Sequence, residues 1–134
     1  MEKAIAMNPF DKIEKRKLKK FDRVYIGSNF CQNLLPKIKK IEELYESGIS
    51  KITLMTPLLT DSYLLKTMNL IENALKLKPE LEVSANDLGV IDLIKGIKEI
   101  KILLARPVSH EFIRMNLNDL EGLIKDLNIK MIEK

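Results

Sequence analysis

The stretch LEVSANDLGVIDLI, residues 81–94, shows in miniature the pattern that runs through the whole chain. Its first half alternates apolar and polar side chains as a β-strand does, and the part after Gly89 has the apolar spacing of a helix. Two polar residues, Asn86 and Asp87, stand at the junction. One explanation is that they cap the helix by accepting hydrogen bonds from its free N–H groups. The other is a ligand site at the carboxyl end of a strand.

The same alternation of strand and helix patterns continues in both directions along the chain. Period-two runs predict strands at residues 3–7, 22–28, 51–57, 81–86, 101–107 and 129–133. Helical spacing predicts helices between them at residues 10–20, 34–47, 61–78, 88–97 and 118–128. Gly48 is expected to end the second helix, because glycine suits the positive φ found there. No hairpin turn joins two strands, which indicates βα units and a parallel sheet.

Two α/β architectures satisfy this pattern, and in both the chain is expected to form a single domain over residues 1–134. One is a partial TIM-type βα barrel, since a complete barrel has eight strands and about 250 residues. The alternative is an open doubly wound sheet, which about six strands complete. Ligands bind beyond the carboxyl ends of the strands in either case.

Composition narrows the class of protein. With 46% hydrophobic and 31% charged residues, the chain has an ordinary soluble composition. No apolar run approaches the roughly 20 residues that cross a bilayer, and no signal peptide is recognisable, so we expect a cytoplasmic protein without a membrane partner. A single cysteine, Cys31, fits a reducing compartment.

The net charge of +4 is concentrated at the N-terminus, where residues 1–20 hold seven lysines and arginines against three acids. Such a patch on the predicted helix at residues 10–20 suits contact with nucleic acid. No aromatic residues are interleaved with it, and the run EKRKLKK also suits the solvated face of a helix. The solvated face is the favoured interpretation.

Polar side chains follow several of the predicted strands, and in a parallel sheet these segments meet at one rim. Asp87 and Arg106 are the candidate catalytic residues, as a general base and as an anchor for a carboxylate or phosphate. The candidate substrate-binding residues are Ser28, Asn29, Asn86 and His110. These residues could equally cap helices or lie in solvent. Asp87 and Arg106 could also form a structural pair with each other. The patterns of zinc proteases, serine hydrolases, P-loop proteins and dinucleotide-binding proteins are absent from the sequence.

Three segments carry a family resemblance. DRVYIGSNFC, then VSANDLGVIDLI, then IKILLARPVSHE resemble, in order and spacing, the collagenase-like peptidases (peptidase family U thirty-two). This family includes ubiquinone-biosynthesis hydroxylation proteins and factors for RNA base hydroxylation. Gly27, the NDLGV turn at residues 86–90, and Ala105-Arg106 in place of a Gly-Arg pair take the family's positions.

The resemblance covers the N-terminal half of the family and implies a βα barrel with its site at the strand ends. Some members hold a four-iron, four-sulfur cluster with four cysteines, and Cys31 stands at one such ligand position. Because thiolate ligation of the cluster needs all four cysteines, we do not expect this chain to form one alone. The cofactor is therefore left open.

Three functions remain open. The first is a short peptidase-like protein that binds a peptide or small substrate at the strand ends, as a homo-oligomer or with a partner chain completing the barrel. The second is a non-catalytic binding or assembly protein on the same scaffold. The third is an RNA-contacting accessory that uses the basic N-terminal helix. The resemblance suggests peptidase or hydroxylation-type activity, but whether the chain is an enzyme is undecided.

Overall fold

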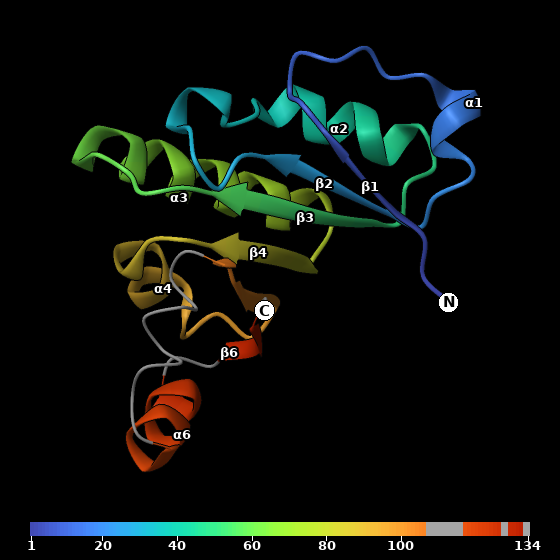
Figure 1. The fold of residues 1–134 in the computed structure, drawn as a ribbon. Coiled ribbons are helices and arrows are strands. Elements are labelled where there is room, and N and C mark those ends of the chain that lie inside the picture. The colour runs from blue at the N-terminus through green and yellow to red at the C-terminus, as the bar shows by residue number, and fades with distance from the viewer. Residues whose placement is uncertain (107–116, 127–128, 133–134) are drawn as a thin grey trace.

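A six-stranded, all-parallel sheet forms the centre of the molecule in the computed structural model, which describes residues 1–106, 117–126 and 129–132 (Figure 1). The strands are β1 (Ala4–Met7), β2 (Arg23–Gly27), β3 (Lys51–Thr56), β4 (Leu81–Ala85), β5 (Ile100–Leu104) and β6 (Ile129–Ile132). The helices are α1 (Lys15–Leu18), α2 (Ile38–Glu46), α3 (Asp61–Leu77), α4 (Leu88–Ile94) and α6 (Leu117–Asp126), with a 3-10 turn η1 (Gln32–Leu34). The predicted α/β class with a parallel sheet is confirmed.

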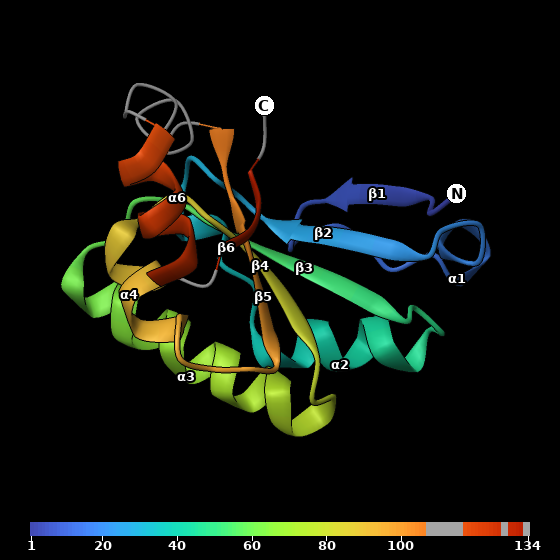
Figure 2. The same cartoon turned by 90° about the horizontal axis from the view of Figure 1, so that it is seen from below.

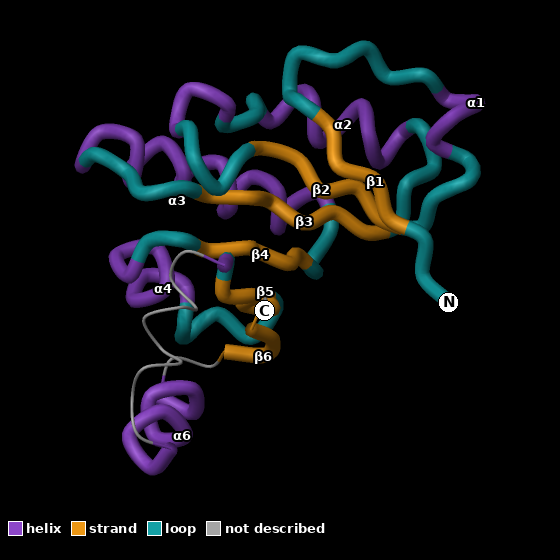
Figure 3. Tube along the Cα trace, viewed as in Figure 1, coloured by secondary structure: helices purple, strands orange, loops and turns teal. Residues whose placement is uncertain are grey.

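The strands lie in the order in which they occur in the chain, β1 to β6, as the tube in Figure 3 shows. This is the strand order of a βα barrel. A doubly wound sheet has a point at which the order reverses, and the six described strands contain no such point. Consecutive right-handed crossovers in one direction leave the helices on one side of the sheet. Figure 2 shows α2, α3, α4 and α6 on that side, which we call the outer face.

The hydrophobic core lies between the outer face of the sheet and these helices. Strand side chains such as Val24, Leu54 and Ile102 are fully buried there. They pack with helix residues such as Ile41 and Ile91 in one cluster. Alternate strand residues point to the opposite, inner face, because side chains on a strand have period two. The side chains of the inner face are therefore the ones on the open side of the sheet, opposite these helices.

Polar side chains occupy the amino-terminal half of the inner face. Thr53 is fully buried, accepts a hydrogen bond of 3.0 Å from Arg23 and donates one of 2.8 Å to Glu82. Arg23 also forms a 2.7 Å ion pair with Glu2, which pairs with Lys51 as well. Hydrogen bonds from Lys51 and Arg23 lower the pKa of Glu2 to about 2. This network joins β2, β3 and β4 to the segment preceding β1.

Two predicted helices are shorter than the sequence pattern indicated. The helix expected at residues 10–20 is the single turn α1, because the side chains of Asn8 and Asp11 form a turn at residues 8–11: Asn8 accepts from the N–H of Phe10, and Asp11 accepts from the N–H of Asn8. Such side-chain bonds compete with helix formation. The helix expected at residues 34–47 begins only at Ile38, because Pro36 forces Leu35 into an extended conformation.

Gly48 ends α2 with a φ of 98°, as expected. Within the described residues, no helix has the length and apolar character needed to cross a membrane.

Candidate functional site

The carboxyl end of β2 is shaped by Gly27, whose φ is 106°. A Cβ atom on this residue would lie 2.5 Å from the backbone oxygen of Met55, so only glycine allows this approach of β2 to β3. The next residue, Ser28, accepts hydrogen bonds through its Oγ from the N–H groups of Phe30 and Cys31, at 3.0 and 3.1 Å. These bonds form the turn that places Asn29 over the end of the sheet.

Asn29 and Asn86 come together at this rim although 57 positions separate them in the sequence. The Nδ2 of Asn86 donates a hydrogen bond of 2.9 Å to the backbone oxygen of Asn29. Ser84, on the inner face of β4, donates through its Oγ to the Oδ1 of Asn29 at 3.4 Å. Asn86 is 5% exposed and Ser84 2% exposed, so the cluster is held within the fold.

The cluster keeps one amide donor and one amide acceptor uncommitted. Within residues 1–106, 117–126 and 129–132, neither the Nδ2 of Asn29 nor the Oδ1 of Asn86 is hydrogen-bonded. A side-chain amide offers two N–H groups and a carbonyl oxygen, which are the complement of a peptide group. A ligand carrying both an N–H and a C=O therefore finds both partners here.

Asp87 is the N-cap of α4, which confirms the capping explanation for the second of the two polar residues that follow β4. Its Oδ1 accepts a 2.7 Å hydrogen bond from the N–H of Gly89. Its Oδ2 accepts one of 2.8 Å from the N–H of Leu59, in the loop between β3 and α3. Both carboxylate oxygens are thus occupied by backbone donors. In the described structure, Asp87 joins two neighbouring loops of the rim.

Three large apolar side chains that follow β2, β3 and β4 are exposed to solvent: Phe30 (83%) and Leu58 (72%) in loops, and Leu88 (58%) at the first residue of α4. Each is the sequence neighbour of a residue that bonds across the loops, namely Asn29, Leu59 and Asp87. The side chain of Gln32 accepts a further bond from the N–H of Thr60 and joins the first two loops. The connections that follow β2, β3 and β4 thus carry both the amide cluster and three exposed apolar side chains.

The remaining predicted site residues are Arg106, His110 and Cys31. Arg106 is exposed and follows β5, and His110 lies outside the described residues. Cys31 is a half-buried free thiol that precedes η1. Among the residues that the structure describes, no group of three or more histidine, cysteine, aspartate or glutamate side chains could hold a metal ion.

Sequence reasoning missed Ser84 and the three exposed apolar residues. Ser84 lies on β4 two positions before Asn86, which directly follows the strand. Because side chains along a strand alternate with period two, the sequence indicated that both face the same side of the sheet. Phe30 stands within the loop SNFC and Leu58 within the loop PLLT, outside the predicted strands and helices, which is the available sign that they are not part of the core.

Comparisons of the chain with protein-family models, curated proteins and solved structures give no match. The resemblance to collagenase-like peptidases therefore stays a hypothesis, and function has to be argued from the geometry of the rim.

Proposed function

We propose that the chain binds a short peptide segment at the carboxyl ends of β2, β3 and β4. The observation that carries the proposal is that two joined residues at one rim keep an unused amide donor and an unused amide acceptor. The donor is the Nδ2 of Asn29, and the acceptor is the Oδ1 of Asn86. A peptide group would accept a hydrogen bond from the first and donate one to the second. Because Asn86 is held by its own bond to the backbone of Asn29, little side-chain freedom is lost on binding.

The exposed side chains of Phe30, Leu58 and Leu88 support a peptide over a fully polar ligand. Large apolar residues are over-represented where proteins bind partners, and burying one contributes roughly 25 cal/mol per Å² of apolar surface. An apolar side chain of the bound segment would contact these residues while its backbone meets the amides. Specificity would then follow the apolar residue of the peptide.

Binding is favoured over bond cleavage as the primary activity. Each carboxylate oxygen of Asp87 accepts one backbone N–H, and these two bonds hold the side chain as the cap of α4 and as a link to the loop between β3 and α3. These contacts give Asp87 a structural role, and catalytic roles for Asp87 and Arg106 remain predictions.

A second copy of the chain is the partner that we propose for the open side of the sheet. Strands β1 and β6 each have one neighbour among the described strands, and unpaired strand edges favour association. On the inner face, Tyr25 and Met55 are only partly buried. A dimer would cover this face, and light scattering of the purified chain measures it directly.

The test of peptide binding is a titration of the ¹⁵N-labelled protein with a blocked tripeptide of leucine and alanine. We expect the side-chain amide signals of Asn29 and Asn86 to shift with saturation. Asn29→Ala and Phe30→Ser should each weaken binding. Asn118→Ala and Leu77→Ser are the matched controls, because they remove an exposed amide on α6 and an exposed leucine at the opposite end of α3.

Shifts confined to other parts of the chain, or equal weakening by the controls, would contradict the proposed site. If Asn29→Ala does not fold, Phe30→Ser alone tests the proposed site. Phe30 is 83% exposed, so its replacement removes no buried contact and the variant should fold.

A further inference from the structure

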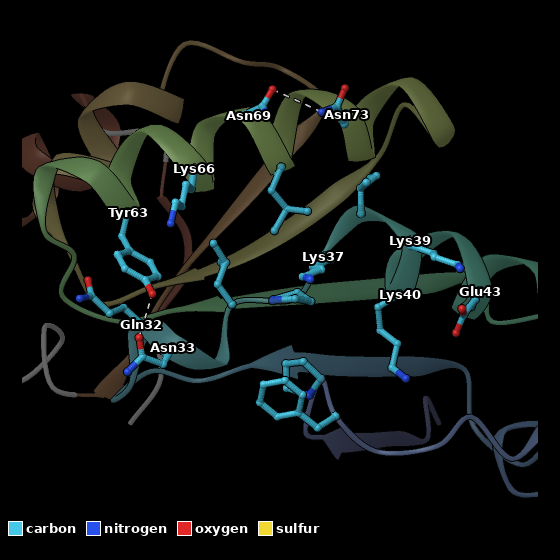
Figure 4. A pocket seen from close by; sticks show the side chains of 16 residues that line it. Gln32, Asn33, Lys37, Lys39, Lys40, Glu43, Tyr63, Lys66, Asn69 and Asn73 are labelled. Carbon is cyan, nitrogen blue, oxygen red and sulfur yellow. Dashed lines mark hydrogen bonds between the residues drawn. The ribbon is translucent and has the colours of Figure 1, made fainter.

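A groove on the outer side of the molecule lies between α2 and α3 and is bordered by the segment that follows β1 (Figure 4). Its volume is about 790 Å³, within the range typical of small-molecule sites. Leu35, Pro36, Ile38 and Leu70 contribute apolar lining. The ligand-contacting residues of the proposed peptide site, Asn29, Phe30 and Asn86, do not line this groove, although Gln32, which joins two loops of the rim, lies at its border.

Cationic side chains enter the groove from both helices. Lys37 stands at the start of α2 and Lys66 on α3; both line the groove, and Figure 4 shows Lys66 extending from α3 on the side of Tyr63. Neither has a carboxylate partner within ion-pair distance in the described part of the chain. Lys40, by contrast, donates to the backbone oxygen of Asp11. Glu43 is the one acidic residue of the lining against four lysines.

Two aromatic rings also line the groove. Phe10 is 78% exposed, an unusual state for a phenylalanine that lines a pocket. The hydroxyl of Tyr63 donates a 2.8 Å hydrogen bond to Asn33, and the Lys66 ammonium lies 4.6 Å from the centre of its ring. The position of Lys66 is thus supported by Tyr63. An exposed ring on the border provides a flat surface on which a planar group can stack.

We propose that this groove binds a phosphate ester that also carries a planar aromatic group, with a nucleoside monophosphate as the representative ligand. The phosphate would lie between Lys37 and Lys66, which act as point charges on an anion. The planar base would stack on Phe10 over the apolar lining. Amide groups at the border, such as those of Asn33 and Asn73, supply hydrogen-bond donors for the remaining polar atoms.

Charge and volume together favour this class of ligand. A neutral apolar molecule would leave two lysines without a partner, and inorganic phosphate alone would leave most of the volume unfilled. A ligand with both an anionic and a planar part uses the lysines and the aromatic border at once.

The test is calorimetric titration of the full chain with AMP, adenosine and inorganic phosphate. AMP should bind more tightly than either of its parts. Lys37→Ala combined with Lys66→Ala should weaken AMP binding by about tenfold or more, the scale of losing charge-assisted contacts. Phe10→Ser should weaken AMP and leave the weak binding of phosphate unchanged. Lys76→Ala is the matched control, because Lys76 lies in the last turn of α3 and does not line the groove.

Three outcomes would overturn the proposal: no binding of AMP, equal binding of AMP by the double variant, or much tighter and steeply salt-dependent binding of a single-stranded oligonucleotide. The last would identify an extended nucleic-acid surface in place of a small-molecule site. Circular dichroism of each variant shows that its fold is kept, and the exposed positions of Lys37 and Lys66 make this the expected result.

Discussion

The Oδ2 atom of Asp87 accepts a 2.8 Å hydrogen bond from the backbone N–H of Leu59, 28 positions earlier in the chain. The same carboxylate caps α4 through Gly89. One side chain therefore satisfies two backbone donors on neighbouring loops, and the geometry of the rim depends on it.

Replacing Asp87 should test this structural role directly. We expect Asp87→Ala to lower the free energy of unfolding by about 2 kcal/mol, because it removes an N-cap and leaves the N–H of Leu59 without its acceptor. Urea unfolding measures the change. Asp92→Ala on the same helix is the control, since its exposed ion pair with Lys95 should contribute little. If Asp87→Ala left stability unchanged while weakening ligand binding, Asp87 would belong to the ligand and not to the scaffold.

Two glycines with positive φ offer a matched comparison, one at the end of β2 and the other after α2. Gly27 and Gly48 have φ values of 106° and 98°, but only Gly27 has a backbone atom close to the position of an added Cβ. Gly48→Ala should cost about 1 kcal/mol for the left-handed backbone alone. Gly27→Ala should cost clearly more, about 3 kcal/mol, because the oxygen of Met55 must also move. Equal losses in thermal or urea unfolding would show that the approach of β2 to β3 is not tight.

The pKa of Glu2 predicts a pH dependence of stability. It falls from 4.5 to about 2 in the folded protein, chiefly through hydrogen bonds from Lys51 and Arg23. Because the folded carboxylate holds its proton less readily than the unfolded one, its contribution to stability is complete above pH 4.5 and is lost as the pH falls toward 2. Denaturant unfolding at a series of pH values should therefore show a smaller acid-induced loss in Glu2→Gln than in the parent protein. Glu14→Gln, at the exposed partner of Lys17, should leave the loss unchanged.

The buried hydroxyl of Thr53 links two charged side chains of opposite sign. Thr53→Val keeps the shape and removes the bonds to Arg23 and Glu82, so we expect a loss of about 1–3 kcal/mol. Thr67→Val is the control at an equally buried position, where the hydroxyl bonds only to the helix carbonyl of Tyr63 and should contribute less. Similar losses in the two variants would mean that the inner-face network adds nothing beyond an ordinary buried hydroxyl.

Much of the fold was predictable because its causes are local. Period-two spacing predicted β4 to within one residue at each end. Helical spacing predicted that α4 begins at Leu88, although the helix ends at Ile94, before the expected residue 97. Gly48 ended α2 as expected. The errors were also local in origin. Asn8 and Asp11 formed a turn where a helix was expected, and Pro36 delayed the start of α2. In the first place hydrogen bonds to side chains, and in the second the pyrrolidine ring of proline, prevented the helix that the apolar periodicity predicted.

The candidate site was predictable only as a set of residue types at strand ends. The sequence placed Asn29, Asn86 and Asp87 after strands, but capping and ligand binding predict the same residues there. It contained no information that separates Asp87, with both oxygens occupied, from Asn86, with a free oxygen.

The sequence by itself determined the alternation of strands and helices, the parallel class of the sheet and the residues that end its elements, because these depend on neighbours a few positions apart. Only the tertiary structure decided the consecutive order of the strands, the contact of Asn29 with Asn86 and the shared groove of Lys37 and Lys66. Those features depend on how segments far apart in the chain approach one another when the core packs, and no local pattern records that approach.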